Sequence, residues 1–435
     1  DPALAERIAE ARRERDAAED EAAAAAPGYR QLVLGSVEPA EAAAALAPDE
    51  ALMVMLVGAG HGHAVALRAD GRALVRRVAL DEARMDALVQ RVRAGLVTGR
   101  AARPFDVAAA HALHEALVAP LAPLLEGASA LLVVADGPML RLPFALLPER
   151  PEDGPGAPWL VRRFAISHMP SPQGLVTLRR APGASAAPLP YAGFGDPVSP
   201  SQAQLRAAFP PDRCANDARV AALLPPLPGT RAEVNVAARL LRAGADRTRL
   251  GEAFTPAAVR GLGLGRHRVI HFATHTVLPG ELSCLREPAL LASPPRGAAD
   301  AQAALITASE VMEWRLDADL VILSACNTAV GPGGGELAGE GLAGLARAFF
   351  FAGTRGVLAT HWAVDDLASA VTVADLLQRQ ERGVRGAQAL RQAQLLLLEG
   401  AGNRFPAEFA HPAWWAPFAL IGDGRREGPA RLAAN

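Results

Sequence analysis

The chain has 435 residues, of which 51% are hydrophobic and 21% charged, and its formal net charge is −2. This composition predicts a globular protein with two or three domains, and the near-neutral charge argues against a general nucleic-acid or anionic-membrane binder. No signal peptide opens the chain, and no apolar stretch approaches membrane-spanning length. We therefore expect a cytoplasmic protein that contacts neither a membrane nor nucleic acid directly.

The chain contains three cysteines, Cys214, Cys284 and Cys326, which lie far apart in unlike sequence contexts. Their spacing gives neither a disulfide framework nor the ligand pattern of a zinc site. A reducing compartment, no metal and no cofactor are the expectations that follow.

The first 27 residues alternate acids, arginines and alanines, which favours a helix. Because the chain begins with Asp1, this helix is interpreted as the end of an upstream helical region. A solvated charged helix with no role of its own is the alternative. Pro27-Gly28 ends the helical pattern.

Strand and helix patterns alternate over residues 28–180, which predicts a first α/β half. The expected strands are 51–57, 63–67, 73–79, 130–135 and 161–170, and the expected helices are 37–47, 80–99, 105–125 and 173–179. Two histidine pairs, His61 with His63 and His111 with His114, suit a metal ion less well than a turn or packing. Residues 181–229 are rich in proline and are interpreted as a linker.

A second α/β half is expected over 230–424, followed by a tail, 425–435. Its first helix, 230–243, has Thr230 and Glu233 in the capping-box pattern. Strands are expected at 268–273, 320–325 and 356–360, with an edge strand at the end of 411–422. Further helices are expected at 256–262, 307–313, 339–351, 367–382 and 385–399.

Three strands of this second half end in polar residues, at His275, at Cys326 and in the stretch from Trp362 to Asp366. In a parallel sheet these ends meet at one edge, where α/β proteins bind ligands. A cysteine beside a histidine suffices for nucleophilic acyl transfer, with backbone N–H groups of Thr276 and Cys326 as oxyanion donors. His275 precedes Cys326 by 51 positions, a separation close to that of caspases, at about 50.

Each residue also has a simpler interpretation. Cys326 alone suits a buried inert cysteine, and His275 alone suits a core histidine. His271 is assigned to packing because it lies inside its strand. The glycine-rich run 331–335 is interpreted as a loop, because it lacks the Gly-Lys-Ser/Thr ending of a phosphate-binding loop.

Several longer motifs resemble the CHAT family of clan CD cysteine peptidases, relatives of caspases and separase. They are His271-Phe-Ala-Thr-His275, Leu323-Ser-Ala-Cys-Asn-Thr-Ala329, the segments 339–349, 359–366, 386–394 and 415–418 and, more loosely, 135–147 and 227–234. The resemblance implies a caspase-like α/β fold with an inactive N-terminal half packed against an active C-terminal half. It also implies a His275–Cys326 dyad and fusion to helical repeats or a sensor region.

Resemblance to separase further implies that an acid after Trp362 lines the S1 pocket with that tryptophan. Asp366 is the first choice and Asp365 the second, and either favours an arginine P1 residue through a charge pair. The alternative is that one of them caps the helix that follows.

The sequence thus predicts a cysteine endopeptidase that cleaves a protein partner after a basic residue and is activated by a partner or signal. An exposed arginine-containing linker is the expected cleavage site, and family analogy suggests a pore-forming or bacterial-defence effector as substrate. A catalytically silent CHAT scaffold in a signalling complex is the alternative. Regulated self-processing, for example at Arg179-Arg180, is a third hypothesis.

Overall fold

The computed structural model describes residues 37–58, 60–96, 104–181, 183–210, 214, 217–222, 224–279, 282, 284–324, 326–327 and 337–424. For 326–327 and 337–343 only the backbone is described. The predicted helical segment 1–27, the glycine-rich loop 331–335 and the tail 425–435 lie outside the described residues.

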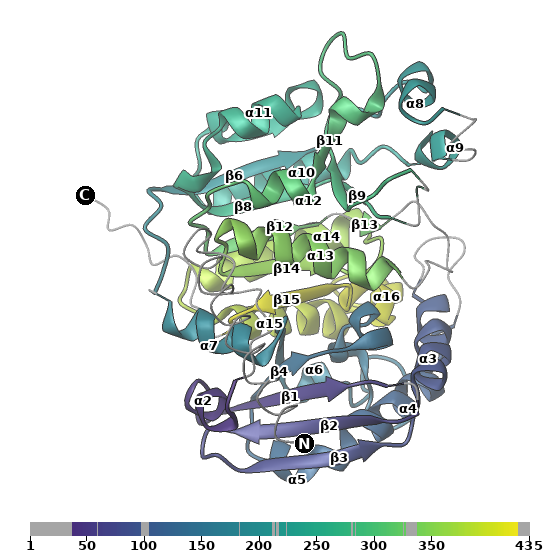
Figure 1. The fold of residues 1–435 in the computed structure, drawn as a ribbon, viewed down its shortest axis with the longest axis vertical. Helices are drawn as coiled ribbons and strands as arrows, with labels where there is room; N and C mark the ends of the chain where they lie inside the picture. Colours follow the sequence, from purple (N-terminus) through teal and green to yellow (C-terminus); the bar gives the residue numbers. More distant parts are fainter. Residues whose placement is uncertain are drawn as a thin grey trace, which may run out of the picture.

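Within the described residues, eleven strands form one mixed sheet in the order β3-β2-β1-β4-β5-β15-β14-β12-β8-β6-β7 (Figure 1). Only the pairs β3–β2, β2–β1 and β15–β14 of this sheet are antiparallel. The bounds are β1 (Glu50–Leu56), β2 (Gly62–Arg68), β3 (Ala73–Val78), β4 (Ala130–Val134), β5 (Ala165–His168), β6 (Leu189–Gly195), β7 (Thr248–Leu250), β8 (His267–Ala273), β12 (Leu320–Leu323), β14 (Gly356–Thr360) and β15 (Phe418–Gly422). The predicted α/β class with mostly parallel strands is confirmed.

The last strand of the chain joins the two predicted halves. β15 lies between β5 of the first half and β14 of the second, so the predicted edge strand is wrong. Five register pairs join β15 to β14, whereas one pair, Ile421 with His168, joins it to β5. The two halves therefore share a continuous sheet whose seam is narrow.

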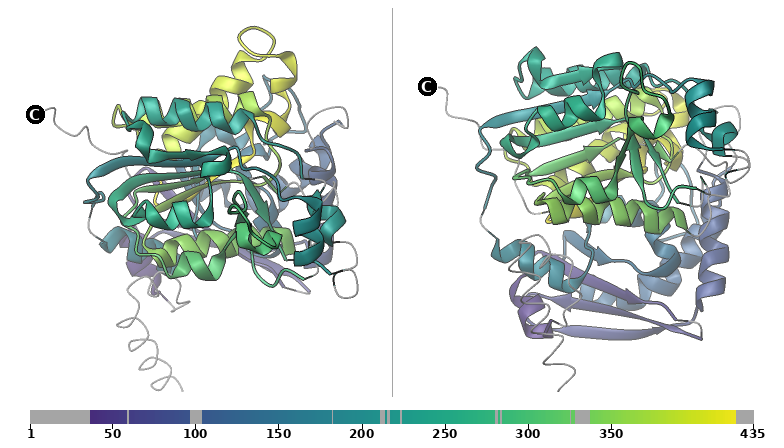
Figure 2. Two further views of the ribbon diagram at one scale, coloured as in Figure 1. Left: turned by 90° about the horizontal axis from the view of Figure 1, so that it is seen from above. Right: turned by 45° about the horizontal axis from the view of Figure 1, so that its top comes forward.

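Helices cover both faces of the sheet (Figure 2). β8, β12 and β14 are buried along their whole length, as expected for apolar strands between two helical layers. The helices are α2 (Pro39–Ala44), α3 (Glu82–Ala94), α4 (Val107–Leu117), α5 (Ala122–Leu125), α6 (Leu160–Arg163), α7 (Pro172–Arg180), α8 (Gln202–Ala208), α9 (Asp217–Ala222), α10 (Gly229–Leu240), α11 (Pro256–Gly261), α12 (Ala308–Met312), α13 (Leu337–Ala352), α14 (Asp366–Gln380), α15 (Gly386–Gly400) and α16 (Pro412–Trp415).

Side chains of β8 alternate between these layers. Val269 packs in the core beneath α10, α14 and α15, whereas Ile270 and Phe272 pack in the core with α11, α12 and α13. His271 therefore faces the α10 layer, because successive residues of a strand point to opposite faces.

The proline-rich segment 181–229 is not a simple linker. It contains β6, a strand of the main sheet between β7 and β8, and the helices α8 and α9. Its strand escaped the sequence analysis because prolines interrupt the apolar pattern around it.

The same segment carries a disulfide that the sequence analysis wrongly excluded. Cys214 and Cys284 are bonded, with their Cα atoms 5.7 Å apart, although 70 positions separate them in the sequence. The Asp217 carboxylate also accepts a hydrogen bond from the backbone N–H of Cys284 at 2.8 Å. This pair removes the cysteine-based argument for a reducing compartment, where disulfides are rare.

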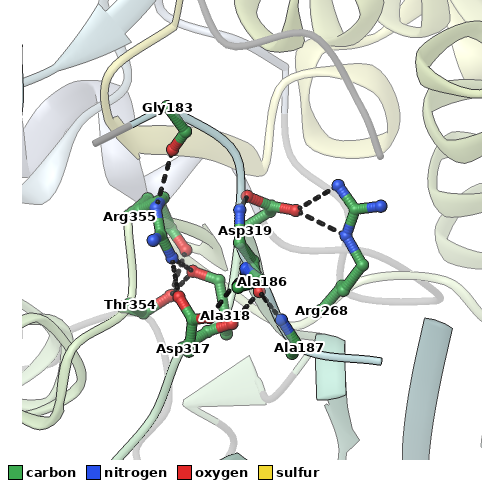
Figure 3. Close-up of polar contacts among 11 residues, drawn as sticks. Gly183, Ala186, Ala187, Arg268, Asp317, Ala318, Asp319, Thr354 and Arg355 are labelled. Carbon is green, nitrogen blue, oxygen red and sulfur yellow. Dashed lines mark hydrogen bonds and ion pairs between the residues drawn. The ribbon is translucent and has the colours of Figure 1, made fainter. Parts of the chain in front are cut away.

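A charged cluster anchors the start of the second half at the amino ends of the strands (Figure 3). Asp319, directly before β12, accepts from Arg268 Nε of β8 at 3.0 Å and from the Ser185 N–H at 2.8 Å. Asp317 lies 2.6 Å from Arg355 Nη1, across the β12–β14 crossover. The two arginines thus neutralise the carboxylates that hold the segment around Ser185, which leads into β6.

Among the described residues, one helical stretch is long and apolar enough to cross a membrane by length and composition, Val107–Leu125. The expectation that no stretch approaches this length is therefore wrong. In the fold this stretch comprises α4, a 3₁₀ turn and α5, and 44% of its most apolar window is buried. Leu113, Leu117 and Leu121 belong to the core of the first half.

Candidate functional site

A second, smaller sheet lies beyond the carboxyl ends of β8 and β12. Its order within the described residues is β11 (Leu305–Thr307), β10 (Ala289–Leu291), β9 (His275–Val277) and β13 (Cys326–Asn327). The chain passes from β8 into β9 through Thr274, and β12 is followed by Ser324 before β13 begins at Cys326. The sequence analysis had placed Cys326 at the end of the main-sheet strand; it belongs to the smaller sheet instead.

The structure brings the backbones of the two predicted catalytic residues together. β9 and β13 are neighbouring parallel strands (Figure 1). Their register makes His275 the partner of Cys326. Register partners in adjacent strands lie about 5 Å apart. The side chain of Cys326 lies outside the described residues, so the geometry rests on the backbone.

His275 as a whole residue is 2% exposed, and its Nε2 lies 2.8 Å from the carbonyl oxygen of Pro225. A carbonyl only accepts hydrogen bonds, which assigns the ring proton to Nε2 and makes Nδ1 the basic nitrogen. Burial lowers the pKa of His275, although the Pro225 carbonyl opposes this effect. The neutral ring required of a general base is therefore favoured.

Thr276, the predicted oxyanion donor, lies in the middle of the smaller sheet. Its register partners are Leu290 in β10 and Asn327 in β13, and the residue is 3% exposed. Its backbone thus follows strand geometry between two neighbours. Its part in an oxyanion hole stays a prediction.

The predicted S1 residues separate into three environments. Asp365 caps α14, because its carboxylate accepts from the N–H groups of Leu367 and Ala368 at 3.0 and 3.1 Å. Trp362 is 6% exposed and donates from its indole to the Ala413 carbonyl at 3.0 Å. Of the three, Asp366 alone is exposed.

Asp366 lies at the start of α14 against the start of α10. A Cβ at Gly229 would clash with the Asp366 side chain, so this contact requires glycine. Burial raises the pKa of Asp366, with further contributions from the charges of Asp365 and Glu233. A cation placed beside this carboxylate would relieve that unfavourable charge.

A buried polar network beneath the strand ends was missed by the sequence analysis. His271 Nε2 lies 2.9 Å from Glu233 Oε1 and 2.9 Å from Ser324 Oγ, and its Nδ1 lies 2.9 Å from the Tyr191 hydroxyl. Ser324 Oγ also donates to Glu233 Oε1, and Ser369 Oγ donates to Oε2 at 2.8 Å. His271 is thus a member of a hydrogen-bonded network rather than a packing residue alone.

The predicted capping box of Thr230 and Glu233 is wrong, since α10 begins at Gly229 with no side-chain cap. Glu233 instead points into the protein and is 3% exposed. The sequence did hold a signal for this: Glu233 precedes Val234 and lies one turn before Ala237, on the apolar face of the helix.

Two groups among the described residues have metal-ligand spacing. The ligand atoms of His111, His114 and Glu115 lie within 4.8 Å of one another on α4, away from the β9–β13 strands. The other group contains Cys214 and Cys284, whose sulfurs are bonded to each other. His61 and His63 lie edge to face, with ring centroids 5.3 Å apart.

Comparison with known proteins places this architecture in a family. The CHAT domain model matches residues 107–423. Tetratricopeptide repeat protein 28 of Mus musculus is 26% identical over 362 residues, and its Homo sapiens counterpart is 25% identical over 364 residues. Each alignment covers 74% of this chain, which spans 13% of the length of these curated relatives.

Two solved structures that match this chain are the following. The separase–securin complex of Saccharomyces cerevisiae matches with a TM-score of 0.47 and 10% identity, over 88% of this chain and 30% of that chain. The Arg-specific cysteine proteinase gingipain R (RgpB) of Porphyromonas gingivalis matches with a TM-score of 0.41 and 11% identity, over 80% of this chain and 76% of that chain. Since the family model covers more than half of the sequence, the chain belongs to the CHAT domain family.

Proposed function

We propose that this protein is a cysteine endopeptidase whose dyad is His275 and Cys326. The observation that carries the proposal is the parallel register of these two residues in β9 and β13. A histidine and a cysteine on adjacent positions of paired strands are within reach of a hydrogen bond between their side chains. Membership of the CHAT family supports the same reaction class.

The reaction follows from the assigned tautomer of His275. Nδ1 accepts the thiol proton of Cys326, and the thiolate attacks the scissile carbonyl carbon. The resulting imidazolium returns its proton to the leaving amine, which leaves a thioester on Cys326. Water then hydrolyses the thioester and regenerates the thiol. The Pro225 carbonyl keeps Nε2–H fixed throughout, so Nδ1 faces this chemistry.

The P1 preference is proposed to be arginine, with Asp366 as the recognition residue. Asp365 is occupied by capping α14, and Trp362 is held in the core, so Asp366 is the carboxylate that remains exposed to a substrate. The guanidinium of an arginine forms a bidentate pair with such a carboxylate.

Activation by a partner or signal is part of the proposal. His275 as a whole residue is 2% exposed in this conformation, so a peptide backbone has little access to it. Binding of an activator that opens the surface over β9 would admit the substrate. The proposed substrate is a protein with an exposed arginine-containing linker, such as a defence effector.

Self-processing at Arg179 is disfavoured by its surroundings. Arg179 forms buried ion pairs with Glu50 and Asp423, and its side chain is 6% exposed. Arg180 is more open but lies in the last turn of α7, a conformation that peptidases do not cleave without unfolding it.

The test uses a peptidyl acyloxymethyl ketone with arginine at P1, compared with glutamate and leucine at P1. We expect covalent labelling of the wild type by the arginine probe and none of Cys326→Ala. Asp366→Ala is expected to lose the arginine preference and to keep labelling. If the wild type resists every probe and every added activator, the protein acts as a CHAT scaffold instead.

A further inference from the structure

The elements that carry the proposed catalytic and recognition residues meet at one buried side chain. Glu233 of α10 contacts His271 of β8, which leads to His275, and Ser324 after β12, which leads to Cys326. Its other carboxylate oxygen accepts from Ser369 of α14, one turn after Asp366. The three contacts are therefore made to the three elements that define the site.

The chemistry of this side chain is unusual for a purely structural role. Burying a carboxylate costs several kcal/mol unless it is fully hydrogen-bonded. Among the described residues its partners are two hydroxyls and an imidazole, with no arginine to neutralise it. An apolar residue on this face of α10 would pack against Val269 and Ile322 without that cost. The fold thus retains a carboxylate whose burial is unfavourable in free energy, at the point where β8 and β12 end.

Directional contacts explain what the group does. The Glu233 carboxylate can only accept, so His271 donates to it from Nε2–H, while the Tyr191 hydroxyl lies 2.9 Å from His271 Nδ1 and 3.4 Å from the Val234 carbonyl oxygen. Burial and the charge of Glu233 hold the pKa of Tyr191 well above its usual value, so this hydroxyl keeps its proton. Each donor in the network is therefore fixed, and rotation of one side chain breaks the contact of another.

We propose that Glu233 is a positioning residue that sets the distance between His275 and Cys326 by tying the ends of β8 and β12 to α10 and α14. Ser324 stands two positions before Cys326, and His271 stands four positions before His275. In the pairing of β8 with β12, Ile322 lies opposite His271. The network therefore joins the two strands just before the chain continues into β9 and β13. This inference rests on the proposed peptidase function, but it also makes a separate prediction about the reactivity of the Cys326 thiol.

The test measures the reactivity of Cys326 as a function of pH by alkylation with iodoacetamide under non-reducing conditions. Cys214 and Cys284 are bonded to each other, so the rate reports Cys326, with Cys326→Ala as the blank. Glu233→Gln removes the negative charge and turns one of the two acceptor oxygens into an amide donor, without a change in volume. We expect the apparent pKa of the thiol to rise by about one unit towards 8.5, which slows alkylation near pH 7 about tenfold.

Two further variants separate positioning from stability. Ser324→Ala removes the contact nearest to Cys326 and is expected to shift the profile in the same direction. Asp319→Asn weakens a buried ion pair at the other end of β12 and is expected to lower the urea midpoint with an unchanged alkylation profile. If Glu233→Gln folds and alkylates with the wild-type profile, the inference is overturned.

The alkylation test of Glu233 and the labelling test of the proposed peptidase activity can succeed or fail independently. A shifted profile in a protein that labels with no peptidyl probe would support the positioning role and reject the peptidase. Where the arginine probe does label the wild type, Glu233→Gln is expected to lower kcat with a smaller change in KM, because the side chain touches no substrate.

Discussion

The two ends of β8 and β12 are built from different chemistry. At the amino ends, Arg268 and Asp319 form a buried ion pair that also holds the backbone of Ser185 (Figure 3). Towards the carboxyl ends, the same strands meet through His271 and Ser324, which are joined by Glu233. At one end two opposite charges are paired, whereas at the other a single carboxylate is held by hydrogen bonds with imidazole and hydroxyl groups.

The two ends therefore have different roles: the amino ends hold the chain in place, and the carboxyl ends set the position of the proposed dyad. A buried ion pair with a further backbone contact fixes the chain where it enters the second half, at the opposite end of β8 and β12 from the proposed dyad. The hydrogen-bonded end lies under the strands that carry His275 and Cys326, where small displacements change the reactivity of a thiol. We expect damage at the amino end to cost stability and damage at the carboxyl end to cost function.

The largest expected effect comes from breaking the amino-end pair. Arg268→Met leaves the Asp319 carboxylate buried without its cation, which should lower the free energy of unfolding by about 3–5 kcal/mol. Urea denaturation followed by tryptophan fluorescence measures this loss. Alkylation of Cys326 in the folded variant should match the wild type.

The control is Arg260→Met, because the ion pair of Arg260 with Glu310 is largely exposed on the arginine side. This variant should lose less than about 1 kcal/mol. A similar loss of unfolding free energy in both variants would mean that the buried Arg268–Asp319 pair stabilises the protein no more than an exposed pair.

The second prediction concerns acid, which should act on a histidine at the end of β5. Burial lowers the pKa of His168, at the end of β5, to about 4. Below pH 6.5 the unfolded chain binds a proton that the folded chain refuses, so stability falls until about pH 4 and then levels off. The total loss from this histidine is about 3 kcal/mol.

His168→Gln removes the titrating group, so its unfolding free energy should depend less on pH between 6.5 and 4. His61→Gln, at an exposed turn, should keep the wild-type pH dependence. Urea midpoints across this range test both variants. Equal slopes in wild type and His168→Gln would show that the buried imidazole is not the source of acid sensitivity.

The smallest effect distinguishes two neighbouring acids at the start of α14. Asp365→Ala removes the helix cap and should cost about 1 kcal/mol of stability. Asp366→Ala leaves the Asp365 cap of α14 in place and should change the P1 preference instead. The comparison of labelling with thermal unfolding for both variants decides whether capping and recognition are divided in this way.

Much of the fold could be predicted from local pattern. Buried runs such as 268–273 and 356–360 predicted strands β8 and β14, because apolar residues bounded by turns suit a sheet covered on both faces. The adjacency of His275 and Cys326 was predicted from strand ends, and the register of β9 and β13 agrees with it. Their catalytic roles stay a prediction.

Other features depended on contacts between distant segments. β15 was predicted as an edge strand because a sequence does not reveal which strands lie beside it. The Cys214–Cys284 pair depends on the segment before α9 reaching the loop after β9. The local sequence around Glu233 fits a capping box. Its carboxylate instead bonds to residues of β8, α14 and the end of β12, which come near it only in the folded protein.

The sequence by itself determined most element types outside segment 181–229, the order of the strand ends and the family motifs, because these follow from residues close together in the chain. The tertiary structure decided which buried polar groups meet. Hydrogen bonds among Glu233, His271, Ser324 and Ser369 join residues up to 136 positions apart. Such contacts have no local period, so they exist only once the sheet and both helical layers are assembled.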